Sequence, residues 1–284
     1  MTNIIAFLLT HQRNFSAGIG MIVSLLTLGL TSGLQSAQAT TPQHLVQAGE
    51  PVQRSVNNAP AELKNLLAQI DASASQGDIK KVMQFYSPNF VHGDGLNRQT
   101  LEQSLITLWK QYPKLRYSTQ LQSWKSEGNA IVAETVTNIT GLPATNGNNM
   151  ALNTTITSRQ RISGAKIVRQ DILSERTLLT SGSKPPQVDF KLPQQVKVGQ
   201  QYTFDAIVNE PLGDDFLLGT ALEEPVQANK YLNPTPVDLQ LLTSGGLFKT
   251  GRAPSTPGSQ WISAVILRGN GITMVTQRLQ VVKQ

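Results

Sequence analysis

The sequence predicts an α+β domain followed by an all-β sandwich. Apolar residues recur with helical spacing from residue 60 to about residue 113, and the spacing then changes to the alternation of strands. Beyond a Gly-, Ser- and Pro-rich stretch at 181–186, only short strand patterns separated by turn signals follow. A run of helices followed by a run of strands is typical of an α+β unit. At 284 residues, two domains are the better expectation.

Residues 1–39 have the pattern of a signal peptide. Arg13 precedes an uncharged stretch from Ala17 to Leu34, and Ala37 and Ala39 supply the small residues that signal peptidase requires. We expect cleavage after Ala39 and a flexible leader over residues 40–59. The apolar stretch is close to the roughly 20 residues of a membrane span, so an uncleaved anchor stays open as the alternative.

Three helices are expected at the start of the first domain, which we place at residues 60–180. The first carries one apolar face, and Asp78 and Asn97 are the expected N-caps of the second and third. Four strands then follow, at 115–121, 130–139, 152–162 and 166–179.

The second domain is expected at residues 187–284, after a linker at 181–186. About seven short strands without a helix indicate a β-sandwich of the immunoglobulin-like type, and Gly269-Asn270-Gly271 is a strong hairpin signal. Residues 210–236 form an acidic, loop-rich stretch that we interpret as solvated loops.

Composition excludes several classes of site. The chain has no cysteine, which removes disulfides, thiolate nucleophiles and cysteine-based metal sites, and its three histidines are too few and too scattered for a metal site. A net charge of +6 without a basic run, together with 6% aromatic residues, argues against nucleic-acid binding. We expect neither a metal nor a cofactor.

Residues 60–180 resemble the NTF2-like superfamily, in its SnoaL-like and ketosteroid-isomerase-like branch. The resemblance is carried by Gly77-Asp78 before the second helix, by the run from Phe85 to Phe90, and by Glu127-Gly128-Asn129-Ala130 before a β-meander. It implies a cone of three helices and a curved antiparallel sheet around an apolar pocket. The whole arrangement is similar to exported cyanobacterial proteins, which implies a periplasm or a thylakoid lumen.

His92 and Asp94 are the candidates for chemistry. The resemblance places Asp94 where isomerase-like members carry a general base, which removes a proton while a second group stabilises the enolate oxygen. Tyr117 and Glu134 are the candidates for that second group. Because Asp94 lies between Gly93 and Gly95, an ordinary turn is the interpretation we favour.

The function we predict is that of an exported, non-enzymatic accessory or binding protein. Its apolar pocket, with Phe90, Trp109 and Tyr117 as candidate lining residues, would take a small apolar ligand or a segment of another exported protein. No stable membrane anchor is expected after cleavage, and a homodimer is compatible with this prediction. The alternative is an isomerase- or hydrolase-like enzyme with Asp94 as its general base.

Overall fold

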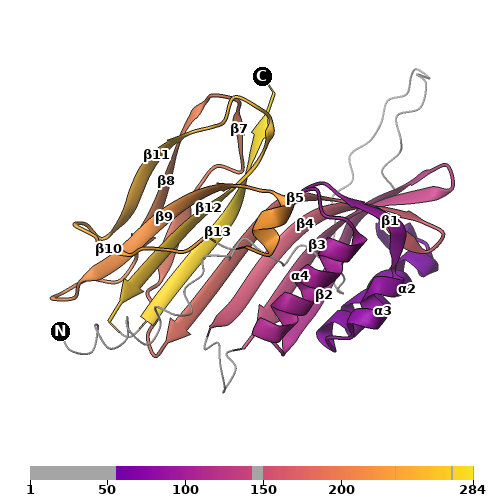
Figure 1. The fold of residues 1–284 in the computed structure, drawn as a ribbon, viewed down its shortest axis with the longest axis horizontal. Coiled ribbons are helices and arrows are strands. Elements are labelled where there is room, and N and C mark those ends of the chain that lie inside the picture. Colours follow the sequence, from indigo (N-terminus) through magenta and orange to yellow (C-terminus); the bar gives the residue numbers. More distant parts are fainter. Residues whose placement is uncertain (1–55, 143–149, 234, 270, 284) are drawn as a thin grey trace, which may run out of the picture.

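The computed structural model describes residues 56–142, 150–233, 235–269 and 271–283, so the predicted signal peptide and most of the leader lie outside the described residues. Strands hold 55% of the described residues and helices 19%. Most strands belong to one ten-stranded sheet that runs through both halves of the chain (Figure 1). The fold is therefore largely β, and the predicted fold class, an α+β domain followed by an immunoglobulin-like sandwich, is wrong, although the N-terminal half is partly consistent with the predicted cone.

The reason lies in strand β5, Lys166–Gly182. One edge of β5 pairs with β4, Ala151–Ser163, while the other edge has two partners in succession. Strand β1, Tyr86–His92, pairs in parallel near residues 167–170, and β13, Gly271–Val282, pairs antiparallel with residues 176–182. The C-terminal strands therefore extend the N-terminal sheet.

Three α-helices lie in the described part of the N-terminal half, and the expected caps of two of them are confirmed. Asp78 accepts a hydrogen bond from the Lys81 amide, and Asn97 forms a capping box with Thr100. A short 3₁₀ turn, η1, precedes them. The bounds are η1 Val56–Asn58, α2 Ala61–Ser75, α3 Ile79–Gln84 and α4 Arg98–Gln111.

The helices cover one face of the sheet, which we call the inner face (Figure 1). Strands β2, Leu115–Glu127, and β3, Ala130–Gly141, complete this half of the sheet in the order β5-β4-β3-β2. Apolar side chains of α2 and α4, such as Leu67, Leu101 and Leu105, pack against inner-face residues such as Ile139 and Ile156 in one buried core.

Strand β2 forms an edge of the sheet, and α2 caps part of that edge. The Asp71 carboxylate accepts hydrogen bonds from the Thr119 amide at 3.0 Å and from the Thr119 hydroxyl at 3.2 Å, while the Ser75 hydroxyl accepts one from the Tyr117 amide at 2.9 Å. Satisfied edge amides are less open to pairing with another chain. The N-terminal half thus protects its edge with side chains of its own first helix.

In the C-terminal half, a second sheet covers the opposite, outer face of the large sheet. Phe190, Phe204 and Leu247 of this small sheet pack against Ile262 and Val275 of the large one. The small sheet has the order β11-β8-β6, and β7 joins the edge of β13. The remaining bounds are β6 Val188–Lys191, β7 Gln195–Lys197, β8 Gln201–Val208, β9 Leu217–Pro225, η2 Ala228–Tyr231, β10 Gln240–Leu241, β11 Gly246–Arg252 and β12 Gly258–Arg268.

A β-bulge in β5 lies between its two halves. Ser158 of β4 is opposite Ile172 and Thr157 is opposite Ser174, so Leu173 is the extra residue. Buried side chains alternate as Gln170 and Ile172 before the bulge, and as Glu175, Thr177 and Leu179 after it. The bulge therefore places Glu175 on the inner face.

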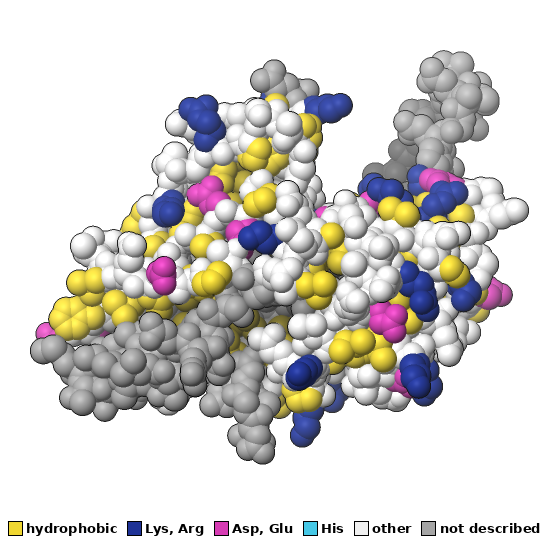
Figure 2. Space-filling model, viewed as in Figure 1, with side chains coloured by type: hydrophobic (Ala, Val, Ile, Leu, Met, Phe, Trp, Pro, Cys, Tyr) yellow, Lys and Arg dark blue, Asp and Glu magenta, His cyan; other side chains and the backbone are white. Residues whose placement is uncertain are grey.

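None of the helices in the described part of the chain is long and apolar enough to cross a membrane. Over the helical half of the face shown in Figure 2, basic and acidic side chains are interspersed with apolar ones. That face therefore lacks the large single-sign field that would attract a polyelectrolyte.

Candidate functional site

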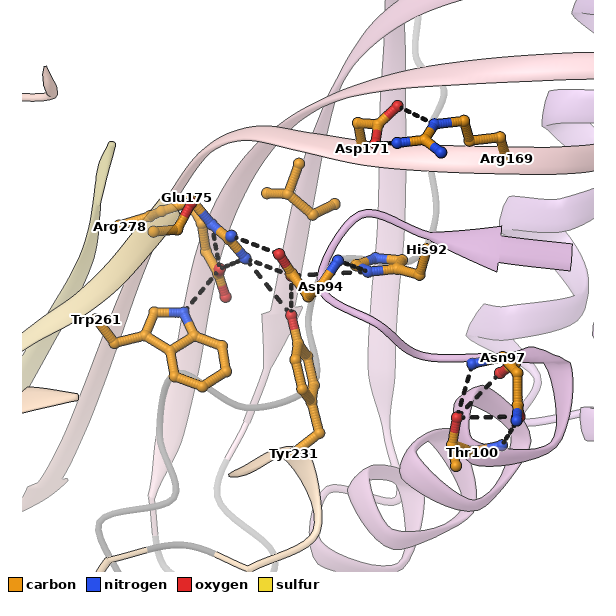
Figure 3. A network of polar contacts seen from close by, with 12 residues as sticks. His92, Asp94, Asn97, Thr100, Arg169, Asp171, Glu175, Tyr231, Trp261 and Arg278 are labelled. Carbon is orange, nitrogen blue, oxygen red and sulfur yellow. Dashed lines mark hydrogen bonds and ion pairs between the residues drawn. The ribbon is translucent and has the colours of Figure 1, made fainter. Parts of the chain in front are cut away.

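The candidate site is a buried polar cluster at the place where β5 changes partners from β1 to β13. Asp94 comes from the turn after β1, Glu175 from β5, Arg278 from β13, Trp261 from β12 and Tyr231 from η2 (Figure 3). Glu175, Arg278, Trp261 and Tyr231 are each 2% exposed. Both halves of the chain thus contribute to one solvent-excluded cluster.

The turn of residues 92–95 holds the backbone of Asp94 in place and so sets the direction of its side chain. The Gly95 amide donates to the His92 carbonyl at 3.0 Å, and the Asp94 amide donates to His92 Nδ1 at 3.1 Å. Gly95 has a φ of +87°, which favours glycine, and a Cβ on Gly93 would lie 2.7 Å from an Asp171 carboxylate oxygen. The turn that we favoured from the sequence is present, and its Asp side chain points into the protein.

Arg278 is the centre of the cluster. Its Nη1 and Nη2 donate to the two carboxylate oxygens of Asp94 at 2.9 and 2.8 Å, and its Nη2 also donates to Glu175 Oε2 at 3.0 Å. The guanidinium lies 5.9 Å from the centre of the Trp261 ring. The paired donation to Asp94 is the fork geometry that makes arginine–carboxylate pairs strong.

Two aromatic side chains from the C-terminal half complete the cluster. Trp261 Nε1 donates to Glu175 Oε2 at 3.1 Å, and the Tyr231 hydroxyl donates to Asp94 Oδ2. The Tyr231 ring packs edge-on against Trp261 at 5.0 Å and against His92 at 6.3 Å. Tyr231 belongs to the stretch 210–236, so not all of that stretch is solvated.

Burial and the charge of Arg278 shift the pKa values of Asp94, Glu175 and His92 in different directions. Burial alone would raise the pKa of Asp94, but the charge and hydrogen bonds of Arg278 outweigh it and hold that pKa below its ordinary range. Burial raises the pKa of Glu175, against the influence of Arg278. Burial lowers the pKa of His92 to about 4, so this imidazole is neutral near pH 7.

This arrangement suits a structural ion pair better than a catalytic base. A general base works best with a pKa near the working pH and with its oxygens within reach of the substrate. The pKa of Asp94 is shifted away from neutrality, and both of its carboxylate oxygens already accept hydrogen bonds from Arg278. Ionised Asp94 therefore serves to balance the charge of a buried arginine.

The other predicted site residues do not join Asp94. Tyr117 accepts a 2.8 Å hydrogen bond from Trp109 Nε1, within the core between the helices and β2. Phe90 is a buried member of the same core, and Glu134 pairs with Arg159 across β3 and β4 at 2.6 Å. Glu134 has its neighbour Thr135 buried on the inner face, so Glu134 itself points to the outer face.

The sequence analysis missed Glu175, Tyr231, Trp261 and Arg278 as members of a site. A signal was present for Arg278, because it is the one charged residue in the strand Gly271–Val282 and its position faces inward. A charged residue at such a position requires a partner, since lone buried charges are too costly. Its partners, however, are 103 and 184 residues away in the chain.

A second feature is a groove on the outer face of strands β2 to β5, where the small sheet does not cover them. We call it the outer groove. Its cavity volume is about 500 Å³. Its lining residues are mostly charged: Ser123, Trp124, Lys125, Glu127, Val132, Glu134, Arg159, Arg161, Arg169 and Asp171.

Comparison with known proteins assigns no function to either feature. A family model described as a domain of unknown function, DUF8623, matches residues 183–282. No curated protein matches the chain. The family match covers the C-terminal half, which supplies Arg278, Trp261 and Tyr231 to the cluster.

Solved structures resemble about two fifths of the chain. Bdellovibrio bacteriovorus Bd1075 is 18% identical over 39% of this chain and 38% of that chain, with a TM-score of 0.30, so the match spans well under half of that protein. A protein with a ketosteroid isomerase-like fold from Catenulispora acidiphila is 9% identical over 38% of this chain and 82% of its own, with a TM-score of 0.28. An LEH-like epoxide hydrolase of M. tuberculosis is 9% identical over 39% of this chain and 80% of its own, with a TM-score of 0.29. TM-scores this low do not establish a shared function.

Proposed function

We propose that this chain is an exported binding protein without catalytic activity of its own. The observation that carries the proposal is the state of Asp94, the one candidate for a general base that the sequence offered. Arg278 donates to both of its carboxylate oxygens, at 2.9 and 2.8 Å, and Tyr231 donates to one of them. Asp94 is a poor acceptor for a substrate proton while this ion pair is intact, and breaking a buried pair by removing one partner costs about 3–5 kcal/mol.

Polar atoms inside the N-terminal half support a binding role. His92 Nε2, Gln160 Oε1 and Thr137 Oγ1 are buried and have no hydrogen-bond partner among the described residues. An unpartnered buried polar atom costs about 1–3 kcal/mol, so such atoms call for water or a ligand that satisfies them. The ligand class that we propose for these atoms is a small molecule with a hydrogen-bonding group and an apolar part.

Catalysis is tested with the full chain and its Asp94→Asn variant on ketosteroid, epoxide and lactone substrates, the classes that the family resemblance implies. We expect no saturable turnover above buffer from the unchanged protein. A turnover that falls by about a hundredfold or more in Asp94→Asn, with the circular dichroism unchanged, would show that Asp94 is a base after all. His92→Gln serves as the second variant, because Asp94→Asn also weakens the ion pair.

Binding is tested by native mass spectrometry of the protein purified from exported material. We expect a small-molecule adduct that is lost in Gln160→Leu, where a side chain of similar size removes the unpartnered oxygen. Gln111→Leu, at the end of α4, is the matched control. An unchanged adduct in Gln160→Leu, or none in the native protein, would contradict an interior ligand site.

A further inference from the structure

The outer groove lies on the face of the sheet opposite to Asp94 and its partners. Strand register brings its charged residues into rows across the sheet. One row contains Lys125 on β2, Val132 on β3, Arg161 on β4 and Arg169 on β5, because these residues pair in sequence across the strands. The row therefore carries three positive charges and no carboxylate.

Arg161 and Arg169 stand directly opposite each other in this row. The Cβ atoms of such cross-strand neighbours are about 4.5–5.5 Å apart, and like charges in this position destabilise a sheet. The two side chains turn toward different carboxylates: Arg169 donates to Asp171 at 2.8 and 2.7 Å, and Arg161 donates to Glu127 on β2. The two guanidinium groups are thus held by carboxylates on different strands.

The outer groove contains fewer acidic side chains than basic ones. The groove contains Lys125, Arg159, Arg161 and Arg169 against Glu127, Glu134 and Asp171. Glu127 is shared, since Lys125 Nζ also lies 2.7 Å from it. The groove therefore holds one positive charge more than it holds negative charges.

Hydrogen-bond donors in the groove also exceed the acceptors. Among the residues that the structure describes, Arg161 donates through Nη1 alone, and Arg169 through Nε and Nη2. This leaves Arg161 Nε and Nη2 and Arg169 Nη1 without a protein acceptor. Their side chains are 41% and 51% exposed, so a solute can reach them.

We propose that the outer groove binds an oxyanion group, of a phosphate, sulfate or carboxylate, between Arg161 and Arg169. Such a group relieves the repulsion of the opposed arginines and accepts from their remaining N–H donors, because a guanidinium can donate to two oxygens of a phosphate, sulfate or carboxylate at once. The proposal goes beyond the binding role proposed above, because it adds a second site with a defined ligand class. It does not depend on Asp94 or on an interior ligand, so loss of one proposal leaves the other standing.

The test is isothermal titration calorimetry of the full chain with inorganic phosphate at low ionic strength. We expect saturable binding of one phosphate, weakened by about tenfold or more in Arg161→Gln and in Arg169→Gln, since a charge-assisted hydrogen bond contributes about 1.5–3 kcal/mol. Glu127→Gln should tighten binding, because it removes the carboxylate that competes for Arg161. Parallel titrations with sulfate and with citrate identify which oxyanion is preferred.

Arg252→Gln is the matched control, because Arg252 lies on β11, outside the groove, and loses the same charge. Binding within about twofold of the unchanged protein is expected for it. Absence of saturable binding, equal weakening in Arg252→Gln, or no gain in Glu127→Gln would overturn the proposal. If Arg161→Gln fails to fold, Arg169→Gln and Glu127→Gln still decide it, because they predict changes of opposite sign.

Discussion

Asp94 and Glu175 both contact the buried Arg278, yet the pKa of Asp94 is lowered and that of Glu175 is raised. The guanidinium can balance one carboxylate, and the bidentate contact favours Asp94. Glu175 has its Oε1 buried without a partner among the described residues, and burial raises its pKa. The two shifts favour ionised Asp94 beside Arg278, and they disfavour the charged form of Glu175.

Glu175→Gln should therefore be mild and Asp94→Asn severe. The amide keeps an oxygen for Trp261 and Arg278, so we expect a change in unfolding free energy below about 1 kcal/mol at pH 7. Asp94→Asn leaves Arg278 without its counter-charge and should cost about 3–5 kcal/mol. Urea denaturation measures both, with Glu102→Gln on α4 as the control. Equal losses in the two variants would show that Glu175 is charged.

The raised pKa of Asp71 predicts that the free energy of unfolding depends on pH. Burial, partly offset by the hydrogen bonds from Thr119, raises its pKa from 3.8 to about 7 in the folded protein. The folded state thus holds the proton more tightly than the unfolded state. Its contribution to stability is complete below about pH 4, falls as the pH rises to about 7, and is then level, with a total loss of roughly 4 kcal/mol.

Asp71→Asn should remove this loss, because the amide can accept from the Thr119 amide and donate to its hydroxyl. The difference in unfolding free energy between variant and unchanged protein should therefore grow in favour of the variant between pH 4 and pH 7. Denaturation at a series of pH values measures it, with exposed Asp238→Asn as the control. A difference that does not vary with pH would show that the pKa of Asp71 is ordinary.

For the buried cluster, the sequence identifies some of the residues but not their partners. His92 and Asp94 were predictable because a polar run between glycines is locally recognisable. Arg278 and Glu175 are hydrogen-bonded to each other but are 103 residues apart in the chain. No local sequence pattern determines that β13 pairs with β5. The pocket residues Phe90 and Tyr117 were predicted from the family resemblance and lie in the core.

Among the elements, helix α4 depends on its N-cap. The Asn97 side chain accepts from the Thr100 amide at 2.9 Å, and the Thr100 hydroxyl accepts from the Asn97 amide at 2.9 Å. Asn97→Ala removes the first of these bonds and should lower the unfolding free energy by about 1 kcal/mol. Thermal unfolding measures the change, and Asn89→Ala on β1 is the control. A loss no greater than that of Asn89→Ala would contradict the capping role.

Local signals predicted the elements that carry strong periodicity or caps. The three helices and strands β2 to β5 were predictable, since each combines an apolar repeat with a cap or a tight turn. Strand β11 was missed because Gly246–Arg252 contains two glycines and no alternation of apolar residues. Its formation depends on pairing with β8, which is a tertiary contact.

For the whole molecule, the shared sheet and the buried cluster couple the two halves. The division into domains at 60–180 and 187–284 stays a prediction, and the pairing of β13 with β5 is a reason to expect them to open together. Hydrogen exchange should give the amides of α4 and of β8 the same limiting free energy of opening. Arg278→Met should make these two values differ, because it breaks the cluster while leaving each core intact. Different values in the unchanged protein would contradict the coupling.

Cleavage of the signal peptide is a separate prediction for the whole chain. Cleavage after Ala39 should yield a mature protein that begins at Thr40, because Ala37 and Ala39 fit the signal peptidase pocket. N-terminal sequencing of the exported protein measures this, and Ala39→Phe, which places a large side chain in that pocket, should block it. Retention of residues 1–39 in the membrane would show that the segment is an anchor.

The bulge at Leu173 has a consequence for how this chain can change over time. Side chains in a strand alternate between faces, and the extra residue is the reason that Ile172 and Glu175, which are three positions apart, both face inward. Deleting Leu173 would remove the bulge and leave regular alternation, with Glu175 still on the inner face. Replacing the bulge by regular pairing without a deletion would instead turn Glu175 outward and turn Arg176 and Leu178 toward the helices. A single deletion between residues 172 and 175 should therefore be tolerated, whereas a mutation that only straightens the strand should break the cluster.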